Sequence, residues 1–258
     1  MYDIPTPLLI LGLLVGMVAV VEGGIRIGQR YGRDIWLKAH QIHAGLAAAA
    51  LALMGLMLAF TFSFSANRYE LRRTLVVTEA TAIQSVRSSL DFLAPQARSA
   101  GLRLLHDYAA KRILYLTVGH DREREDQAAA QSRVLFGGLW RLAVASDHYA
   151  VTEPQLRAAQ YRELTGALLD LNRVAREREA ARDRTVPQSV NAMLFALAMG
   201  AGAVLSYTAG ASGHPDRPPI YAVLVLVCLV IYLIIDFDRP RRGLMHLDAA
   251  PLRQQLSG

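Results

Sequence analysis

Four long apolar runs constrain the fold of this chain more than any other feature of its sequence. They cover residues 5–23, 45–65, 190–209 and 220–235. A helix needs roughly 20 apolar residues to cross the hydrocarbon core of a bilayer, so each run is a candidate span. The chain is also 53% apolar, which is unusual for a soluble protein. The sequence therefore predicts an all-α integral membrane protein with four transmembrane helices.

The first run is interpreted as a retained span. A cleaved secretory signal has a positively charged start, and no basic residue precedes this run. The first two spans fall within 1–66, with a basic interfacial loop at 24–44 between them. The last two spans fall within 189–237.

The polar section at 67–188 is predicted to form a cytoplasmic helical domain. Apolar residues recur in it at helical spacing, as at Leu102, Leu105 and Tyr108. Four helices are expected, at 67–93, 96–118, 126–148 and 153–184. Because no Gly or Pro interrupts 60–93, the first of them can continue the second span without a break. Residues 238–258 are expected to form a cytoplasmic C-terminal tail.

Basic residues near the span ends predict the orientation. An even number of spans places both termini and the polar section on one side of the membrane. That side carries eleven Arg near the span ends: Arg68, Arg72, Arg73, Arg173, Arg176, Arg178, Arg182, Arg184, Arg239, Arg241 and Arg242. The other side carries five basic residues: Arg26, Arg30, Arg33, Lys38 and Arg217. We therefore expect a multi-pass membrane protein with both termini in the cytoplasm.

The sequence contains no recognisable catalytic pattern. It has no Gly-x-Ser-x-Gly, no His-Glu-x-x-His, no phosphate-binding loop and no pair of cysteines. His40 and His43 share a helix face, but no third metal ligand lies near them in the sequence. We expect no enzyme activity, cofactor, metal site or nucleic-acid partner.

Ionisable residues occur at the ends of the spans and not in their middles. Glu22 closes the first span and can pair with Arg26, four residues later. A second set follows the last span and is predicted to form a salt-bridge cluster at the helix end. Its members are Asp236, Asp238, Arg239, Arg241 and Arg242.

Glycines recur at a spacing that lets helices approach closely. Gly24, Gly28 and Gly32 lie four residues apart, as in helix pairs that pack tightly in membranes. The spacing predicts a close helix contact but leaves open whether it lies within one subunit or between two.

The second span carries a stripe of residues whose character changes along its length. Positions spaced by three and four share a helix face, and on this face the stripe reads Ala52, Leu56, Phe60, Ser63 and Asn67. Phe64 lies beside it, and Arg68, Arg72 and Arg73 follow. The pattern fits ordinary helix packing. It also fits a pore with a hydrophobic constriction that opens into a basic cytoplasmic vestibule.

Two segments resemble a known family. The sequence LAFTFSFSANRYELRRTLVVTEATAIQSVR (58–87) and the ending YLIIDFDRPRRGLMHLDAAPL (232–252) are similar to the bestrophin-like membrane proteins, which are distantly related to bestrophin anion channels. The resemblance implies a homopentamer, with four membrane helices per subunit and a cytoplasmic helical body. It also implies that the second helices line the pore, with Ala52, Leu56 and Phe60 in its neck. Ala52 departs from the bulky aliphatic residue expected at its position.

The resemblance favours a homo-oligomeric channel for small inorganic anions, embedded in membrane lipids. The alternative is a non-conducting scaffold or sensor whose cytoplasmic helices recruit a partner. The two hypotheses differ in whether the second span faces a central axis or packs against its neighbours.

Overall fold

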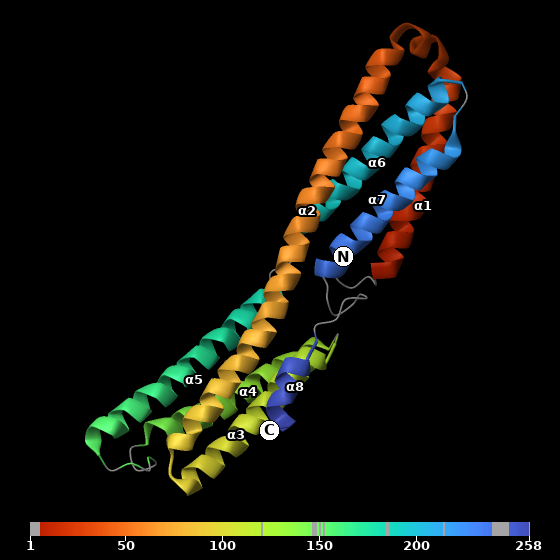
Figure 1. Cartoon of the computed structure of the whole chain (residues 1–258). Coiled ribbons are helices and arrows are strands. Elements are labelled where there is room, and N and C mark those ends of the chain that lie inside the picture. The colour runs from red at the N-terminus through yellow and green to blue at the C-terminus, as the bar shows by residue number, and fades with distance from the viewer. Residues whose placement is uncertain are drawn as a thin grey trace. The chain divides into compact units, whose positions relative to one another are not determined.

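The computed structural model describes residues 6–119, 121–145, 149, 151, 153–183, 186–213, 215–238 and 248–257. Within these ranges the structure consists of helices and their connections (Figure 1). The helices are α1 (Thr6–Tyr31), α2 (Arg33–Ser89), η1 (Leu90–Phe92), α3 (Pro95–Thr117), α4 (Arg122–Val144), α5 (Pro154–Asp183), α6 (Gln188–Ala211), α7 (Arg217–Asp238) and α8 (Ala250–Ser257). No strand occurs among the described residues, where Leu93 and Tyr149 form an isolated bridge. The all-α prediction is confirmed.

The chain divides into two compact units. The first comprises Met1–Tyr69 and Thr185–Met245, and the second comprises Glu70–Arg184 and His246–Gly258. Helix α2 contributes its first part to one unit and its second part to the other. The described C-terminal helix α8 belongs to the second unit.

The first unit contains the membrane-spanning helices. Among the described residues, four helical segments are long and apolar enough to cross a bilayer: Leu8–Tyr31, Ala44–Phe92, Ser189–Ala211 and Arg217–Asp238. This confirms the prediction of four spans. The 49 residues of the α2 segment would extend about 74 Å as a helix, far more than the roughly 30 Å of a hydrocarbon core. Since its apolar run ends at Ser65, only the first part of that segment has the composition of a span.

The expected loop at 24–44 is wrong, because this region is mostly helical. Helix α1 continues to Tyr31 and α2 begins at Arg33. A glycine inside a helix costs about 1 kcal/mol relative to alanine. Here the glycines allow α1 to pack closely on α6, where a larger side chain would not fit. A Cβ added at Gly28 would lie 2.3 Å from the carbonyl oxygen of Tyr207 in α6, and one added at Gly210 would lie 2.3 Å from that of Ile25. The close helix contact predicted from the glycine spacing therefore lies within one protomer, between α1 and α6.

The second unit buries its own apolar core. Helices α3, α4 and α5, the second part of α2 and α8 contribute to it, with Ile83, Leu105, Leu139, Leu168 and Leu252 among its members. The helix predicted at 126–148 begins earlier, at Arg122, because the Asp121 side chain accepts a hydrogen bond from the Arg124 amide and caps it. The possible continuation of the second span into the polar section is realised, since α2 runs unbroken to Ser89.

Candidate functional site

The residues proposed for a pore all lie on the exposed surface of the protomer. Phe60 is 55% exposed, and Leu56 and Phe64 are exposed to a similar extent. The smaller members of the set are exposed as well: Ala52, Ser63 and Asn67. The structure thus places these six residues on α2 where its own bundle does not cover them.

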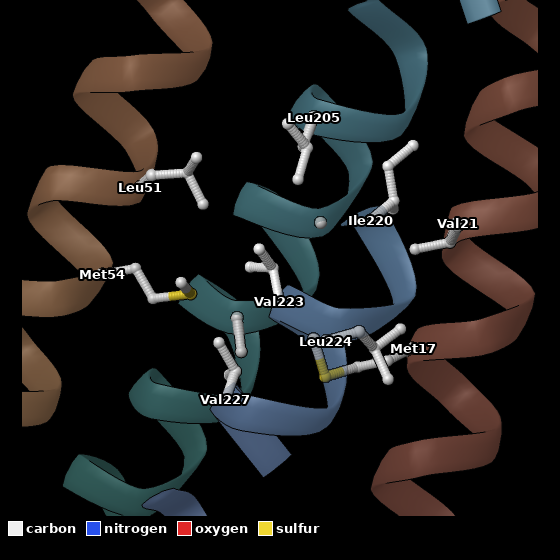
Figure 2. A pocket seen from close by; sticks show the side chains of 11 residues that line it. Met17, Val21, Leu51, Met54, Leu205, Ile220, Val223, Leu224 and Val227 are labelled. Atoms are coloured by element: carbon white, nitrogen blue, oxygen red, sulfur yellow. The ribbon is translucent and has the colours of Figure 1, made fainter. Parts of the chain in front are cut away.

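The opposite face of α2 packs on its own protomer. Met54, Leu58, Thr61 and Ser65 are buried, and a helix turns by about 100° per residue, so these positions point away from the Phe60 side. Figure 2 shows Met54 extending from α2 toward the other side chains that line a pocket. A cavity of about 20 Å³ lies among α1, α2, α6 and α7 there, and it is lined by apolar side chains. Such a lining offers a water molecule few polar partners.

Residues 60–65 combine aromatic rings with hydroxyl groups because they are divided between the exposed face and the packed face of α2. The Thr61 hydroxyl donates to the Met57 carbonyl oxygen at 2.7 Å, and Ser65 is completely buried. The Phe62 ring lies edge-on to Phe237 of α7, with centroids 5.6 Å apart. Helical spacing therefore places the phenylalanines at 60 and 64 on the exposed surface and the hydroxyls at 61 and 65 on the packed face, while Ser63 is exposed.

The three arginines expected in a vestibule occupy different environments. Arg68 is partly exposed, and its Nη1 lies 3.7 Å from Asp238 Oδ1. Arg73 is exposed and lies 3.8 Å from Glu70. Arg72 is only 8% exposed, and its Nε donates to the Ala181 carbonyl oxygen at 3.3 Å. Arg72 therefore does not have the exposed position expected of a vestibule residue. It lies on the packed face of α2, and its side chain contacts α5.

The predicted cluster after the last span is partly described. Asp236 and Asp238 are buried, and Arg239, Arg241 and Arg242 lie outside the described residues. Both carboxylate oxygens of Asp238 accept from the Val186 amide, at 2.9 and 3.1 Å. Its described cationic partner is Arg68 of α2, so this carboxylate joins the end of α7 to two other segments of the first unit.

Glu22 also finds partners outside its own helix. It accepts a 2.6 Å hydrogen bond from the Tyr221 hydroxyl and lies 3.4 Å from Arg217. These two residues of α7 contact Glu22, and the charge of Arg26, the partner expected from the sequence, acts on it as well. No group of three potential metal ligands occurs among the described residues, and the side chains of His40 and His43 lie outside them.

A buried ionic network in the second unit was missed by sequence reasoning. Glu79 and Arg112 are completely inaccessible, and Arg178 is nearly so. Arg112 and Arg178 each donate to one oxygen of the Glu79 carboxylate. Arg112 also donates to Glu179 at 2.9 Å, so helices α2, α3 and α5 meet at these charges.

The network is supported by neighbouring groups. The Tyr115 ring lies 4.8 Å from the Arg112 guanidinium carbon and 5.2 Å from that of Arg178, which are distances typical of cation–π contacts. Burial by itself would lower the pKa of the Arg112 guanidinium, but the charge and hydrogen bond of Glu79, together with Tyr108 and Glu179, outweigh burial and that pKa is raised. The sequence did carry a signal, because Arg112 shares a helix face with apolar and aromatic residues. The structure buries these neighbours: Leu105, Tyr108, Ala109, Tyr115 and Leu116.

The sequence profile of the Bestrophin-like domain matches residues 11–252, which is nearly the whole chain. The protein belongs to the Bestrophin-like family. This confirms the family resemblance of the two segments at 58–87 and 232–252.

Solved structures share the fold of this bestrophin-like chain. A mutant of a bacterial bestrophin homologue from Klebsiella pneumoniae is 15% identical, with a TM-score of 0.60 over 96% of this chain and 99% of that one. A second structure, described as a membrane protein, is 16% identical with a TM-score of 0.57, over 96% and 94% of the two chains. No curated protein sequence matches the chain. At these identities the likeness concerns the fold.

Proposed function

We propose that this bestrophin-like protein is a homo-oligomeric ion channel that passes small inorganic anions through a pore lined by α2. The observation that carries the proposal is the exposure of the Ala52–Asn67 stripe opposite the packed face of the same helix. A protomer offers only one such wall. Several copies related by a rotation axis would enclose a path between their α2 helices, and the family resemblance favours five.

The order of residues along the stripe suits a gate followed by a wider mouth. Ala52, Leu56 and Phe60 would form apolar rings, and an apolar constriction can stop ions by excluding water. Ser63 and Asn67 follow, with hydroxyl and amide groups that can replace water around an ion. The partly exposed guanidinium of Arg68 and the exposed one of Arg73 would raise the local anion concentration at this end. A path of this kind requires no catalytic group.

The proposed orientation places the second unit and both termini in the cytoplasm of a bacterium, with the first unit in its inner membrane. Cysteine labelling in sealed vesicles tests it. Cys228 is buried and can be replaced by Ala to give a cysteine-free parent. A Ser212→Cys variant should then react with an impermeant thiol reagent from the periplasmic side, and a Gln131→Cys variant from the cytoplasmic side. The reverse pattern would invert the orientation.

Chloride flux from proteoliposomes tests conduction. Phe60→Ala should change the flux several-fold because it removes a ring from the constriction, and Arg68→Ala should reduce it. Leu226→Ala is the matched control, since Leu226 is an equally exposed apolar residue on α7. Flux that stays the same in all three variants would refute the pore lining proposed for α2.

Particle symmetry separates the channel from the scaffold. Single-particle images of the purified protein should show a closed ring with α2 nearest the axis. A dimer, or a ring whose centre is filled by lipid or another helix, would favour a non-conducting scaffold that recruits a partner.

A further inference from the structure

One exposed face of α1 is apolar along most of the helix and ends in two arginines. Residues three or four apart share a helix face. The apolar row on this face consists of exposed side chains: Leu8, Leu11, Val15 and Val18. Arg26 and Arg30 continue the same face and are exposed as well, whereas the glycines that contact α6 lie on the other side of the helix. The face therefore presents an apolar surface followed by positive charge.

The two arginines lie at the depth of lipid headgroups. An α-helix rises about 27 Å from Leu8 to Arg26, which is close to the roughly 30 Å of a hydrocarbon core. The start of α7 lies at the same level, since Arg217 is 3.4 Å from Glu22 of α1 (Figure 1). From Arg217 to its end α7 rises about 32 Å, so both helices place their arginines at one membrane interface.

The arginines of α1 have few partners within the protein. Among the described residues at this end of the helices, the ion pair is that of Arg217 with Glu22. Arg26 acts on Glu22 through its charge, and the Arg30 guanidinium carbon lies 5.6 Å from the centroid of the Tyr31 ring. Three arginines and one carboxylate leave two positive charges at this surface, and these charges lie beside the apolar row.

An anionic phospholipid matches both parts of this face. The guanidiniums of Arg26 and Arg30 are about one helical turn apart, and arginine can donate two hydrogen bonds to one phosphate. The acyl chains of the same lipid can lie along the apolar row. Glu22 is half-buried on this face, but its charge is balanced because it pairs with Arg217 and accepts from the Tyr221 hydroxyl. A small inorganic anion would use the arginines and gain nothing from the apolar row.

In the proposed orientation these arginines face the periplasm. Lys and Arg near span ends normally concentrate on the cytoplasmic side, so setting the orientation does not account for the arginines at this end. The phosphate of an anionic lipid supplies a counter-charge at the depth where they lie.

We infer that Arg26 and Arg30, with Arg217 beside them, bind the phosphate of an anionic phospholipid whose acyl chains lie along the apolar row of α1. A zwitterionic phospholipid should bind more weakly, because its own ammonium group balances its phosphate. The inference concerns the outer surface of the first unit and does not depend on whether the protein conducts ions.

Native mass spectrometry of the full-length, delipidated protein in detergent tests the inference. The protein is titrated with phosphatidylglycerol or with phosphatidylcholine of the same acyl chains, and the fraction of protein with bound lipid is measured. The test variants are Arg26→Gln/Arg30→Gln and the charge-preserving Arg26→Lys/Arg30→Lys. The control is Arg103→Gln/Arg141→Gln, which removes two exposed arginines of the second unit.

The wild type should retain phosphatidylglycerol several-fold more than phosphatidylcholine. Arg26→Gln/Arg30→Gln should remove this preference, and the control should keep it. Arg26→Lys/Arg30→Lys should keep part of it, because lysine retains the charge but lacks the planar fork. Equal retention of the two lipids by the wild type would overturn the inference. So would a preference that survives in the glutamine variant, or one that is lost equally in the control.

A competition experiment on the wild type separates a lipid from a free phosphate ester and requires no variant. Glycerol phosphate carries the phosphate without acyl chains, so an excess of it should leave most of the phosphatidylglycerol bound. Displacement of the lipid by an equal concentration of glycerol phosphate would show that the arginines recognise a soluble anion, and the lipid site would be rejected.

Discussion

Arg178 of α5 donates to the carboxylate of Glu79 in α2, 99 residues earlier in the chain, and both side chains are buried. Arg112 of α3 donates to the other oxygen of the same carboxylate. Glu79 is therefore the anion that allows two guanidiniums to stay inside the second unit. Through it, the second part of α2 is fixed to α3 and α5 within the second unit.

Glu79→Gln should destabilise the second unit strongly. The substitution keeps the shape of the side chain but leaves two buried guanidiniums without their shared counter-charge, and breaking such a buried pair costs about 3–5 kcal/mol. Thermal unfolding of the purified protein in detergent measures the effect. Arg173→Gln serves as the control and should change the melting temperature little, because its ion pairs with Asp170 and Glu177 are exposed. Equal melting temperatures for the two variants would contradict the assigned role.

Gly28→Ala should disrupt the contact between α1 and α6. The new methyl group would meet the Tyr207 carbonyl oxygen, which belongs to the backbone and cannot rotate away. Overpacking of this kind typically costs about 1–3 kcal/mol. Gly23→Ala is the matched control on the same helix, since nothing lies within 4 Å of its added Cβ. Size-exclusion profiles recorded after stepwise heating should show earlier loss of the Gly28→Ala protein, and the expectation fails if the control is lost first.

Arg72→Ala and Arg73→Ala should differ although the two residues are adjacent. Arg72 is buried and donates to Ala181, so its loss leaves a buried carbonyl without this donor, at a cost of about 1–3 kcal/mol. Arg73 is exposed, and its loss should leave the melting temperature unchanged while lowering anion flux. A fall in flux without a fall in stability for Arg72→Ala would place its guanidinium in the ion path instead.

Asp238→Ala should loosen the junction between α7, α2 and the start of α6. Removing the carboxylate deprives the buried Val186 amide of the two oxygens that accept its hydrogen bond, which is expected to cost about 1–3 kcal/mol. Asp238→Asn keeps one acceptor oxygen and should lie between the wild type and Asp238→Ala in melting temperature. Glu163→Ala, at an exposed position of α5, provides the baseline. The assigned role is contradicted if Asp238→Asn and Asp238→Ala both match that baseline.

Local sequence patterns predicted the helices and spans correctly, because the type and length of these elements depend on residues close together in the chain. Apolar runs near 20 residues predicted the spans because a bilayer sets their length. The helices of the second unit were predicted close to their observed bounds from periodicity, Pro95, Gly119 and Pro154. Sequence reasoning failed at 24–44, where a basic interfacial loop was expected but α1 continues to Tyr31 and α2 begins at Arg33. It also missed the partners of Arg72 and Arg112, which lie in helices distant in the sequence.

By itself, the sequence determined that the chain is helical and spans a membrane, and that α2 turns from apolar to polar along one face. These properties follow from composition and from a period of 3.6 residues, which are local. Only the tertiary structure decided which face of α2 is packed and which is exposed, that the glycines join α1 to α6, and that Glu79 holds two arginines. Those outcomes depend on side chains that are far apart in the chain. The free-energy cost of burying an unpaired charge, or of leaving a gap in the packing, favours one arrangement of the helices over the others.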